Sequence, residues 1–107
     1  MIKKYFVLVC LSLFIKDTMS HTLLEEVTTR RKDAQQQVEV GAIYSHYRNP
    51  KLQYKVIDIG IQEATEKACV IYKALYADEV VWVRDLDVWL EPVEHEGKKV
   101  PRFQKVK

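Results

Sequence analysis

The fold is decided by one stretch of sequence, Cys69-Val70-Ile71-Tyr72-Lys73-Ala74-Leu75-Tyr76. β-Branched and aromatic residues dominate it, as they do in strands that are partly buried. Successive side chains of an extended chain point to opposite sides. One face therefore carries Val70, Tyr72, Ala74 and Tyr76, and the other carries Cys69, Ile71 and Leu75. The stretch predicts a β-strand with two different faces.

Four further stretches of similar composition predict strands, and turn-forming residues separate them. They are Ala42–Tyr47, Tyr54–Ile59, Val80–Arg84 and Val88–Val93. Turns are expected at Arg48-Asn49-Pro50-Lys51, at Ala77-Asp78-Glu79 and at Gly97, whereas Thr65–Ala68 is a loop or a turn. In Val80–Arg84, alternation would put Val81 and Val83 on one face and Trp82 and Arg84 on the other. Pro92 would move the last strand to a sheet edge.

Short connections between these strands predict an antiparallel sheet, because a parallel sheet needs long crossovers. The organised part is short, and a domain of this size buries only about 60% of its unfolded surface. So small a chain is expected to close its sheet into a barrel, which leaves no exposed edge. The prediction is a mainly β fold, one small antiparallel barrel of about five strands over residues 40–107.

Residues 1–18 form a separate apolar segment. Lys3 and Lys4 precede the apolar run Tyr5–Ile15, which is typical of a secretory signal and too short to span a bilayer. The residues that follow, Lys16-Asp17-Thr18-Met19-Ser20, lack the small residues of a cleavage site. Either this segment is translated and takes the protein to a membrane or out of the cell, or the natural start is Met19 and the protein is cytoplasmic.

Residues 19–39 predict a helical or flexible extension of the barrel. Thr22 and Glu25 have the spacing of a capping box, in which two side chains satisfy the free amides of a first helical turn. Apolar residues then recur at helical spacings, namely Leu23, Val27, Ala34 and Val38. A helix that packs against the domain is the third hypothesis for the N-terminal region.

The charge and the cysteines exclude several classes of protein. The formal net charge is +2, which is smaller than the positive charge that proteins usually need to bind nucleic acid. Cys10 and Cys69 form no CxxC pair or Cys/His cluster, so neither a zinc site nor a disulfide framework is expected. With only three glycines in the chain, a loop that cradles phosphates is not expected either. We therefore expect no metal and no cofactor.

The candidate ligand-binding residues are aromatic or basic side chains within the predicted strands and turns. They are Tyr44, His46, Tyr72, Trp82, Arg84 and Arg102. His46 could donate a proton or contact a ligand near neutral pH, or it could be a hydrogen-bonded structural residue. Arg84 could stack on Trp82 or clamp a carboxylate or phosphate. Alternatively, an ion pair with Asp85, Asp87 or Glu91 could hold Arg84, and Arg102 could pin the C-terminal tail to the barrel.

Three hypotheses for function follow. The first is a non-catalytic binding module whose aromatic and Arg-bearing face takes a peptide, a nucleic acid or a small anionic ligand. The second is a small enzyme that uses His46 as acid or base and an Arg as substrate clamp. The third is an accessory interaction domain whose protein partner adds a strand to an exposed edge near Val88–Val93.

Several short motifs, in this order and spacing, resemble a small bacterial family catalogued as domain of unknown function 1653. They are Gly41 with Tyr44, His46 and Tyr47; Val70, Tyr72 and Ala74-Leu75-Tyr76; Trp82-Val83-Arg84; Glu91 and Val93; and Gly97 with Val100-Pro101-Arg102-Phe103. The resemblance covers about residues 40–104, and it implies a small SH3/Tudor-like barrel and no established activity.

Two positions depart from the pattern of this family. Members often carry His-Ser-Glu-Thr or His-Thr-Glu-Thr between the second and third strands, where this chain has Gln62-Glu63-Ala64-Thr65. Any role of that His and Glu is therefore in doubt for this chain. Trp-Val-Arg is usually followed by Pro, and here Asp85 follows.

Overall fold

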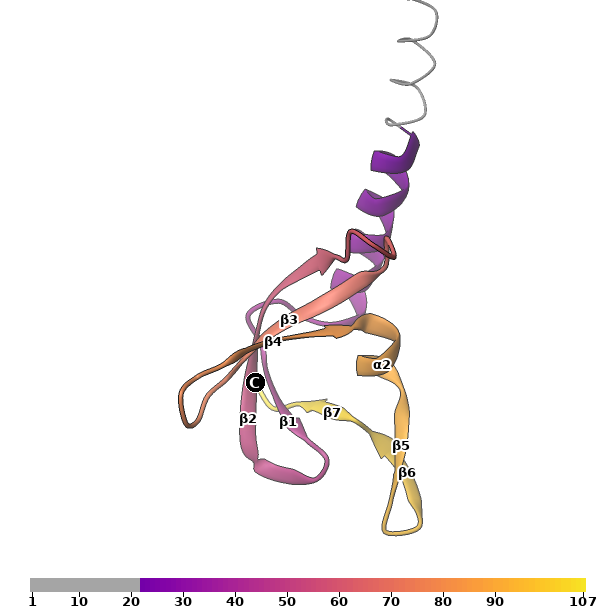
Figure 1. Ribbon diagram of the computed structural model, residues 1–107. Coiled ribbons are helices and arrows are strands. Elements are labelled where there is room, and N and C mark those ends of the chain that lie inside the picture. The colour runs from indigo at the N-terminus through magenta and orange to yellow at the C-terminus, as the bar shows by residue number, and fades with distance from the viewer. Residues whose placement is uncertain (1–21) are drawn as a thin grey trace, which may run out of the picture.

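A curved antiparallel sheet of five strands forms the body of the protein in the computed structural model, which describes residues 22–107 (Figure 1). The strand order is β4-β3-β2-β1-β7. The strands are β1 (Ile43–His46), β2 (Asn49–Ile61), β3 (Ala68–Ala74), β4 (Val81–Asp85) and β7 (Phe103–Lys105). The predicted mainly β, antiparallel fold is confirmed. The hypotheses on residues 1–18 and on a start at Met19 lie outside the described residues.

Strand β3 has the two different faces that its sequence predicts. Val70, Tyr72 and Ala74 are buried, whereas Ile71 and Lys73 between them are only partly buried. The strand pairs with β2 on one side and with β4 on the other. A strand in this position needs apolar side chains on its core face along most of its length, which explains why its signal in the sequence is strong.

The sheet does not close into the predicted barrel. Within residues 22–107, β4 and β7 stand at the two ends of the strand order and do not pair with each other. The segment between them forms a short helix and a separate two-stranded sheet, β5 (Pro92–His95) with β6 (Lys98–Pro101). No strand is therefore left to bridge the two edges, and the sheet stays open.

The prediction of a strand over Val88–Val93 is wrong at its first half. Residues Leu86–Leu90 form helix α2, and only Pro92 begins a strand. Helical spacing places Trp89 in the core and Leu86 beside it. The helix ends before Pro92 because a proline disfavours helical geometry in the residue before it, and Glu91 is extended, with φ −65° and ψ 124°.

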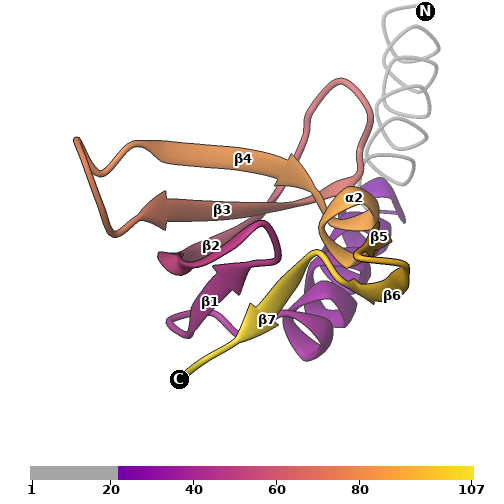
Figure 2. The same cartoon turned by 90° about the horizontal axis from the view of Figure 1, so that it is seen from below.

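The β5–β6 hairpin turns at the position that Gly97 predicts. His95 pairs with Lys98, so Glu96 and Gly97 form a two-residue loop. Both residues have positive φ, 53° and 76°. Positive φ at both loop positions is the geometry of a type I′ turn, which matches the twist of the two strands and favours glycine. Figure 2 shows this hairpin and α2 together at one end of the sheet.

The N-terminal helix, residues 22–37, packs on the sheet through its C-terminal end. Ala34 and the following Val38 are fully buried, whereas Leu23 is 42% exposed. The predicted apolar stripe therefore reaches the core only at its last two members. Arg31 attaches the helix to β2, since its Nε donates to the Ile59 carbonyl (2.8 Å) and its Nη2 to Asp58 Oδ1 (2.9 Å). In residues 22–107, no helix has the length and apolar character to cross a membrane.

Candidate functional site

A pocket of about 210 Å³ lies on one face of the sheet, and every strand of the sheet contributes to its walls. We call this face, which carries the buried rings, the aromatic face. The lining residues are His46 from β1, Tyr54 from β2, Tyr72 from β3, Trp82 and Arg84 from β4, and Phe103 from β7. The strand register brings them together, because His46 is directly opposite Phe103 and Tyr72 is directly opposite Trp82. Residues opposite each other share a face of the sheet.

Helix α2 supports the lining of the pocket through the buried Trp89. The Trp89 ring stacks on the Phe103 ring with centroids 3.7 Å apart and planes 4° from parallel. Tyr72 meets Trp89 edge to face at 5.0 Å, and it meets Phe103 in the same way at 5.6 Å. Edge-to-face contacts like the two of Tyr72 contribute about 0.5–1.5 kcal/mol each beyond the buried area. Trp82, by contrast, is 50% exposed and forms an open wall.

Arg84 places a positive charge in the pocket without a carboxylate partner. Its guanidinium carbon lies 5.5 Å from the centre of the Phe103 ring, and its Nε donates to the Tyr72 hydroxyl at 3.3 Å. No carboxylate of residues 22–107 lies within ion-pair distance of it. The alternatives in which an acidic residue holds Arg84, or Trp82 stacks on it, are therefore wrong, and Phe103 takes the stacking role.

His46 is a neutral wall of the pocket near pH 7. Burial lowers its pKa below the ordinary value of 6.5, and the positive charges of Arg84, Arg102 and Arg48 lower it further. Its Nδ1 accepts the backbone N–H of Arg48 at 3.2 Å. The neutral ring therefore carries its proton on Nε2, which leaves that nitrogen as a hydrogen-bond donor.

Tyr54 closes the pocket on the β2 side. Its hydroxyl shares a short hydrogen bond with the Tyr76 hydroxyl. Burial and this hydrogen bond raise the pKa of Tyr54 to about 12. The side chain therefore stays protonated and uncharged in the physiological range, and Arg84 supplies the only formal charge among the lining residues near neutral pH.

Four of the six residues predicted from the sequence line this pocket, namely His46, Tyr72, Trp82 and Arg84. Tyr44 is instead buried on the aromatic face, where its ring meets Trp89 edge to face and its hydroxyl accepts the Glu39 N–H at 3.0 Å. Arg102 is outside the pocket lining. Its Nε donates to the Val88 carbonyl at 3.0 Å, and its Nη2 lies 3.7 Å from Glu91 Oε1.

Sequence reasoning missed two lining residues, Tyr54 and Phe103. A signal for each was present. Tyr54 begins a predicted strand that returns antiparallel to the strand of Tyr44, and the two tyrosines are directly opposite. Phe103 follows Arg102 in the Val100–Phe103 motif, but its pairing with His46 links strands that are distant in sequence. Such a long-range pairing cannot be derived from local composition.

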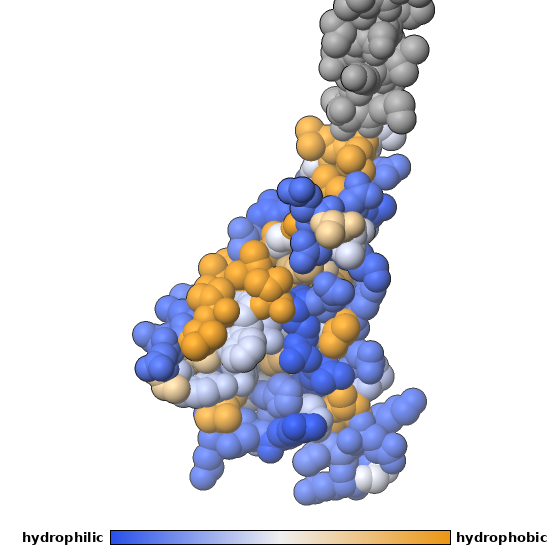
Figure 3. Space-filling model, in the orientation of Figure 1, coloured by the Kyte–Doolittle hydropathy of each residue, from blue (hydrophilic) through white to orange (hydrophobic). Residues whose placement is uncertain are grey.

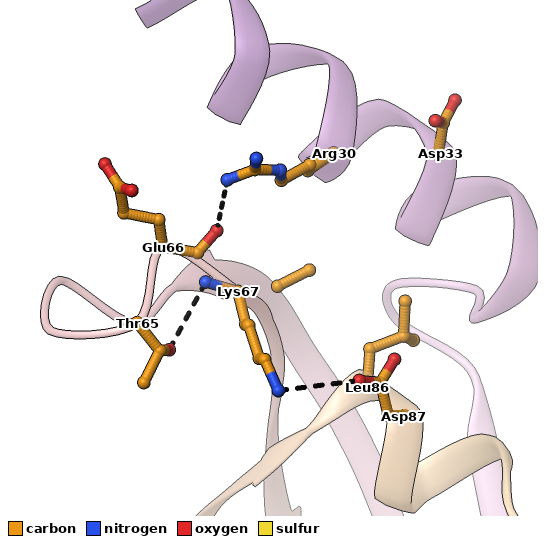
Figure 4. Close-up of a pocket in the computed structure, with 8 residues that line it drawn as sticks. Arg30, Asp33, Thr65, Glu66, Lys67, Leu86 and Asp87 are labelled. Carbon is orange, nitrogen blue, oxygen red and sulfur yellow. Dashed lines mark hydrogen bonds and ion pairs between the residues drawn. The ribbon is translucent and has the colours of Figure 1, made fainter. Parts of the chain in front are cut away.

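A larger hollow of about 470 Å³ lies between the N-terminal helix, the β2–β3 loop and α2 (Figure 4). Its cations already have partners. Arg30 Nη1 donates to the Glu66 carbonyl at 2.8 Å, and Lys67 Nζ lies 3.9 Å from Asp87 Oδ2. Three acidic residues, Asp33, Glu66 and Asp87, share the lining with these two cations, so the hollow has no excess of positive charge. Within residues 22–107, no three His, Cys, Asp or Glu side chains gather as a metal site would require.

Comparisons with known proteins agree with the motifs. Residues 42–105 match the model of a family described as protein of unknown function (DUF1653). The chain is also similar to a crystal structure of a DUF1653 protein from Bordetella bronchiseptica, with 28% sequence identity and a TM-score of 0.57. The similarity covers 65% of this chain and 90% of that one. A search of curated proteins finds no match. Since the family model spans more than half of the sequence, the chain belongs to the DUF1653 family.

Proposed function

We propose that this chain is a small, non-catalytic binding module and that the pocket on its aromatic face holds an anionic ligand with a flat apolar part. The observation that carries this proposal is the state of Arg84. Its guanidinium is held by the Phe103 ring and the Tyr72 hydroxyl, and no carboxylate among residues 22–107 neutralises it. A guanidinium in such a place is suited to a carboxylate or a phosphate, which it can bind through two parallel hydrogen bonds.

The charge of Arg84 also argues against a cationic ligand. Pockets lined by several aromatic rings often hold ammonium groups, because the faces of the rings attract cations. Here Phe103 already has the Arg84 guanidinium above its face. A second cation in a pocket of about 210 Å³ would stand close to this charge and be repelled.

The shape of the pocket limits the part of the ligand that enters. Pockets for drug-sized molecules have volumes of roughly 300–1,000 Å³, and this pocket is smaller, at about 210 Å³. One ring with one charged group fits such a volume. The half-exposed Trp82 offers a flat surface against which this ring can stack. The Nε2 donor of His46 is a second group for the anion.

The first experiment follows the tryptophan fluorescence, to which Trp82 and the buried Trp89 contribute, while the full chain is titrated with phenyl phosphate and with benzoate. The variant R84Q removes the charge and keeps a polar side chain. We expect it to bind at least about tenfold more weakly, because hydrogen bonds to charged groups contribute about 1.5–3 kcal/mol and 1.4 kcal/mol is tenfold in affinity. The matched control is R30Q in the larger hollow, which should bind like the wild type. Equal binding by wild type and R84Q would contradict the proposal.

A mixed-sequence oligonucleotide is the third probe, because stacking platforms also suit single-stranded nucleic acid. Binding of nucleic acid falls steeply with salt, since each neutralised phosphate releases a counterion. A ligand held at the single charge of Arg84 should instead show a shallow dependence on salt. A steep dependence together with oligonucleotide binding would favour nucleic acid as the natural ligand.

The second candidate is an enzyme, and one observation favours it: His46 and Arg84 line the same pocket. Because Nδ1 of His46 already accepts the Arg48 N–H and Nε2 carries the ring hydrogen, Nε2 is the nitrogen that could donate to the leaving oxygen of a substrate. The test is hydrolysis of phenyl phosphate by wild type and H46Q. If the wild type hydrolyses phenyl phosphate, and H46Q binds it equally well but does not hydrolyse it, the enzyme hypothesis would be favoured over the binding module.

A further inference from the structure

The outer edge of β4 is an exposed apolar strand. The strand ends the order β4-β3-β2-β1-β7, and within residues 22–107 nothing pairs with its outer side. Four successive apolar residues at this edge are about half exposed or more, namely Val80 (49%), Val81 (51%), Trp82 (50%) and Val83 (61%). Figure 3 shows hydrophobic side chains gathered in a band beside β3 and β4. Unprotected edges of this kind pair with other strands.

The opposite edge of the sheet has the protection that β4 lacks. Strand β7 is only three residues long and includes the exposed Gln104 and Lys105. The Lys105 ammonium lies 3.0 Å from Glu39 Oε2. Short length and a lysine are two of the features by which proteins prevent pairing at an edge. The contrast shows that β4 is open to pairing in a way that β7 is not.

The hydrogen bonds to β3 determine which backbone groups of β4 are available. The Ala74 N–H donates to the Val80 carbonyl at 3.0 Å. In an antiparallel pair, the residues that bond to one neighbour alternate with those that face away from it. Val80, Trp82 and Arg84 therefore bond to β3, whereas Val81, Val83 and Asp85 direct their N–H and C=O groups outward.

We propose that β4 pairs antiparallel with β4 of a second copy of this chain, about a two-fold axis at Val83. This register pairs Val83 with the partner's Val83, and Val81 with the partner's Asp85. Both pairs use only residues whose backbone groups face outward. An axis at Trp82 would also use outward groups, by pairing Val81 with the partner's Val83, but it would place Asp85 opposite the partner's Glu79. Two like charges directly opposite each other are destabilising. An axis at Val81 would pair Val83 with the partner's Glu79, which lies in the β3–β4 turn with φ 55°.

The side chains are compatible with this register. Arg84 stands opposite the partner's Trp82, in the pair type where side chains are closest. No two like charges are opposite, and the arrangement is isologous, as in most two-fold dimers. The rotation keeps both aromatic faces on the same side of a continuous sheet. The two pockets then lie next to each other, and each Trp82 wall has the partner's Arg84 beside it.

The sharpest test is cross-linking through one introduced cysteine in a C10S background, which keeps the buried Cys69. Val83 would face its own copy with Cα atoms about 5.5 Å apart, within the range of about 4.4–6.8 Å that a disulfide requires. We expect V83C to form a covalent dimer under mild oxidation. V81C, at a position that is also half exposed on the same strand, would face the partner's Asp85 and should stay uncross-linked. The C10S chain itself, with Cys69 buried, is the control for the native thiol.

Sedimentation of the full chain over a concentration series gives the second measurement. We expect a wild-type dimer and a V83P monomer, because proline removes an outward N–H and leaves the bonds to β3 intact. V83A keeps the N–H and should still form the dimer, and V83K should be monomeric because two lysines would meet at the axis. A monomeric wild type, a V83K dimer, or cross-linking of V81C equal to that of V83C would overturn the proposal.

Discussion

Arg84 shows how much a single residue depends on the strand that carries it. Its sequence neighbour Asp85 points to the opposite face of β4, because side chains alternate along a strand, and there it accepts from the Cys69 thiol at 3.4 Å. Asp87 lies in α2, beside Lys67. Both acidic residues near Arg84 in sequence are thus directed elsewhere, and its charge is left among aromatic rings.

His46 is expected to make the stability of the protein depend on pH. Its pKa in the folded state is lowered, by burial and by three arginines, below the unfolded value of 6.5. The unfolded chain therefore binds more protons as the pH falls through this range, so the free energy of unfolding decreases. The contribution of neutral His46 to the free energy of unfolding is complete above the pKa of the unfolded chain. It is lost as the pH falls through the lower pKa of the folded protein.

The measurement is urea unfolding between about pH 5 and pH 8 for wild type and H46Q, since histidine is the side chain that ordinarily titrates there. We expect the free energy of unfolding of the wild type to rise with pH more steeply than that of H46Q. Equal slopes for the two proteins would show that burial and the arginines do not act on His46 as described.

Helix α2 is the element on which the pocket rests. Trp89 is buried to 3% exposure and stacks on Phe103, whose other contacts include the His46 and Arg84 side chains. W89A should lower the free energy of unfolding by about 3–5 kcal/mol, the usual cost of removing a large buried aromatic side chain. W89F retains a ring and should lose less. Urea unfolding of both variants would check this order, and a W89A chain as stable as the wild type would contradict the role of α2.

The same helix marks the limit of what the sequence could predict. Periodicity of two identified the strands at Cys69–Tyr76 and Val80–Arg84, and a glycine identified the hairpin turn at Gly97. Leu86–Leu90 is too short for a helical period to be distinguished from a strand. The sheet was expected to close because so small a chain would leave no exposed edge, whereas the segment of residues 86–101 forms α2 and a separate hairpin and does not join β4 to β7. The open edges follow from this helix and from the separate β5–β6 sheet, which local composition could not assign.

At the scale of the molecule, the candidate site depends on the complete strand order. His46 and Phe103 are opposite although they are distant in sequence, and five strands have to assemble before the pocket exists. The residue types were visible beforehand at His46, Tyr72, Trp82 and Arg84, because aromatic and basic residues occur there within the predicted strands. Tyr44 and Arg102 look similar in sequence, and packing against α2 takes both out of the pocket lining.

Nuclear magnetic resonance can detect directly whether the aromatic face binds an anion at Arg84. In the ¹⁵N-labelled chain, the Nε–H signal of Arg84 and the indole N–H signal of Trp82 are followed during titration with phenyl phosphate. We expect saturable shifts of both signals at the same midpoint, with little change at Arg30 and Lys67. Shifts confined to Arg30 and Lys67, or no saturable shift at Arg84, would contradict it.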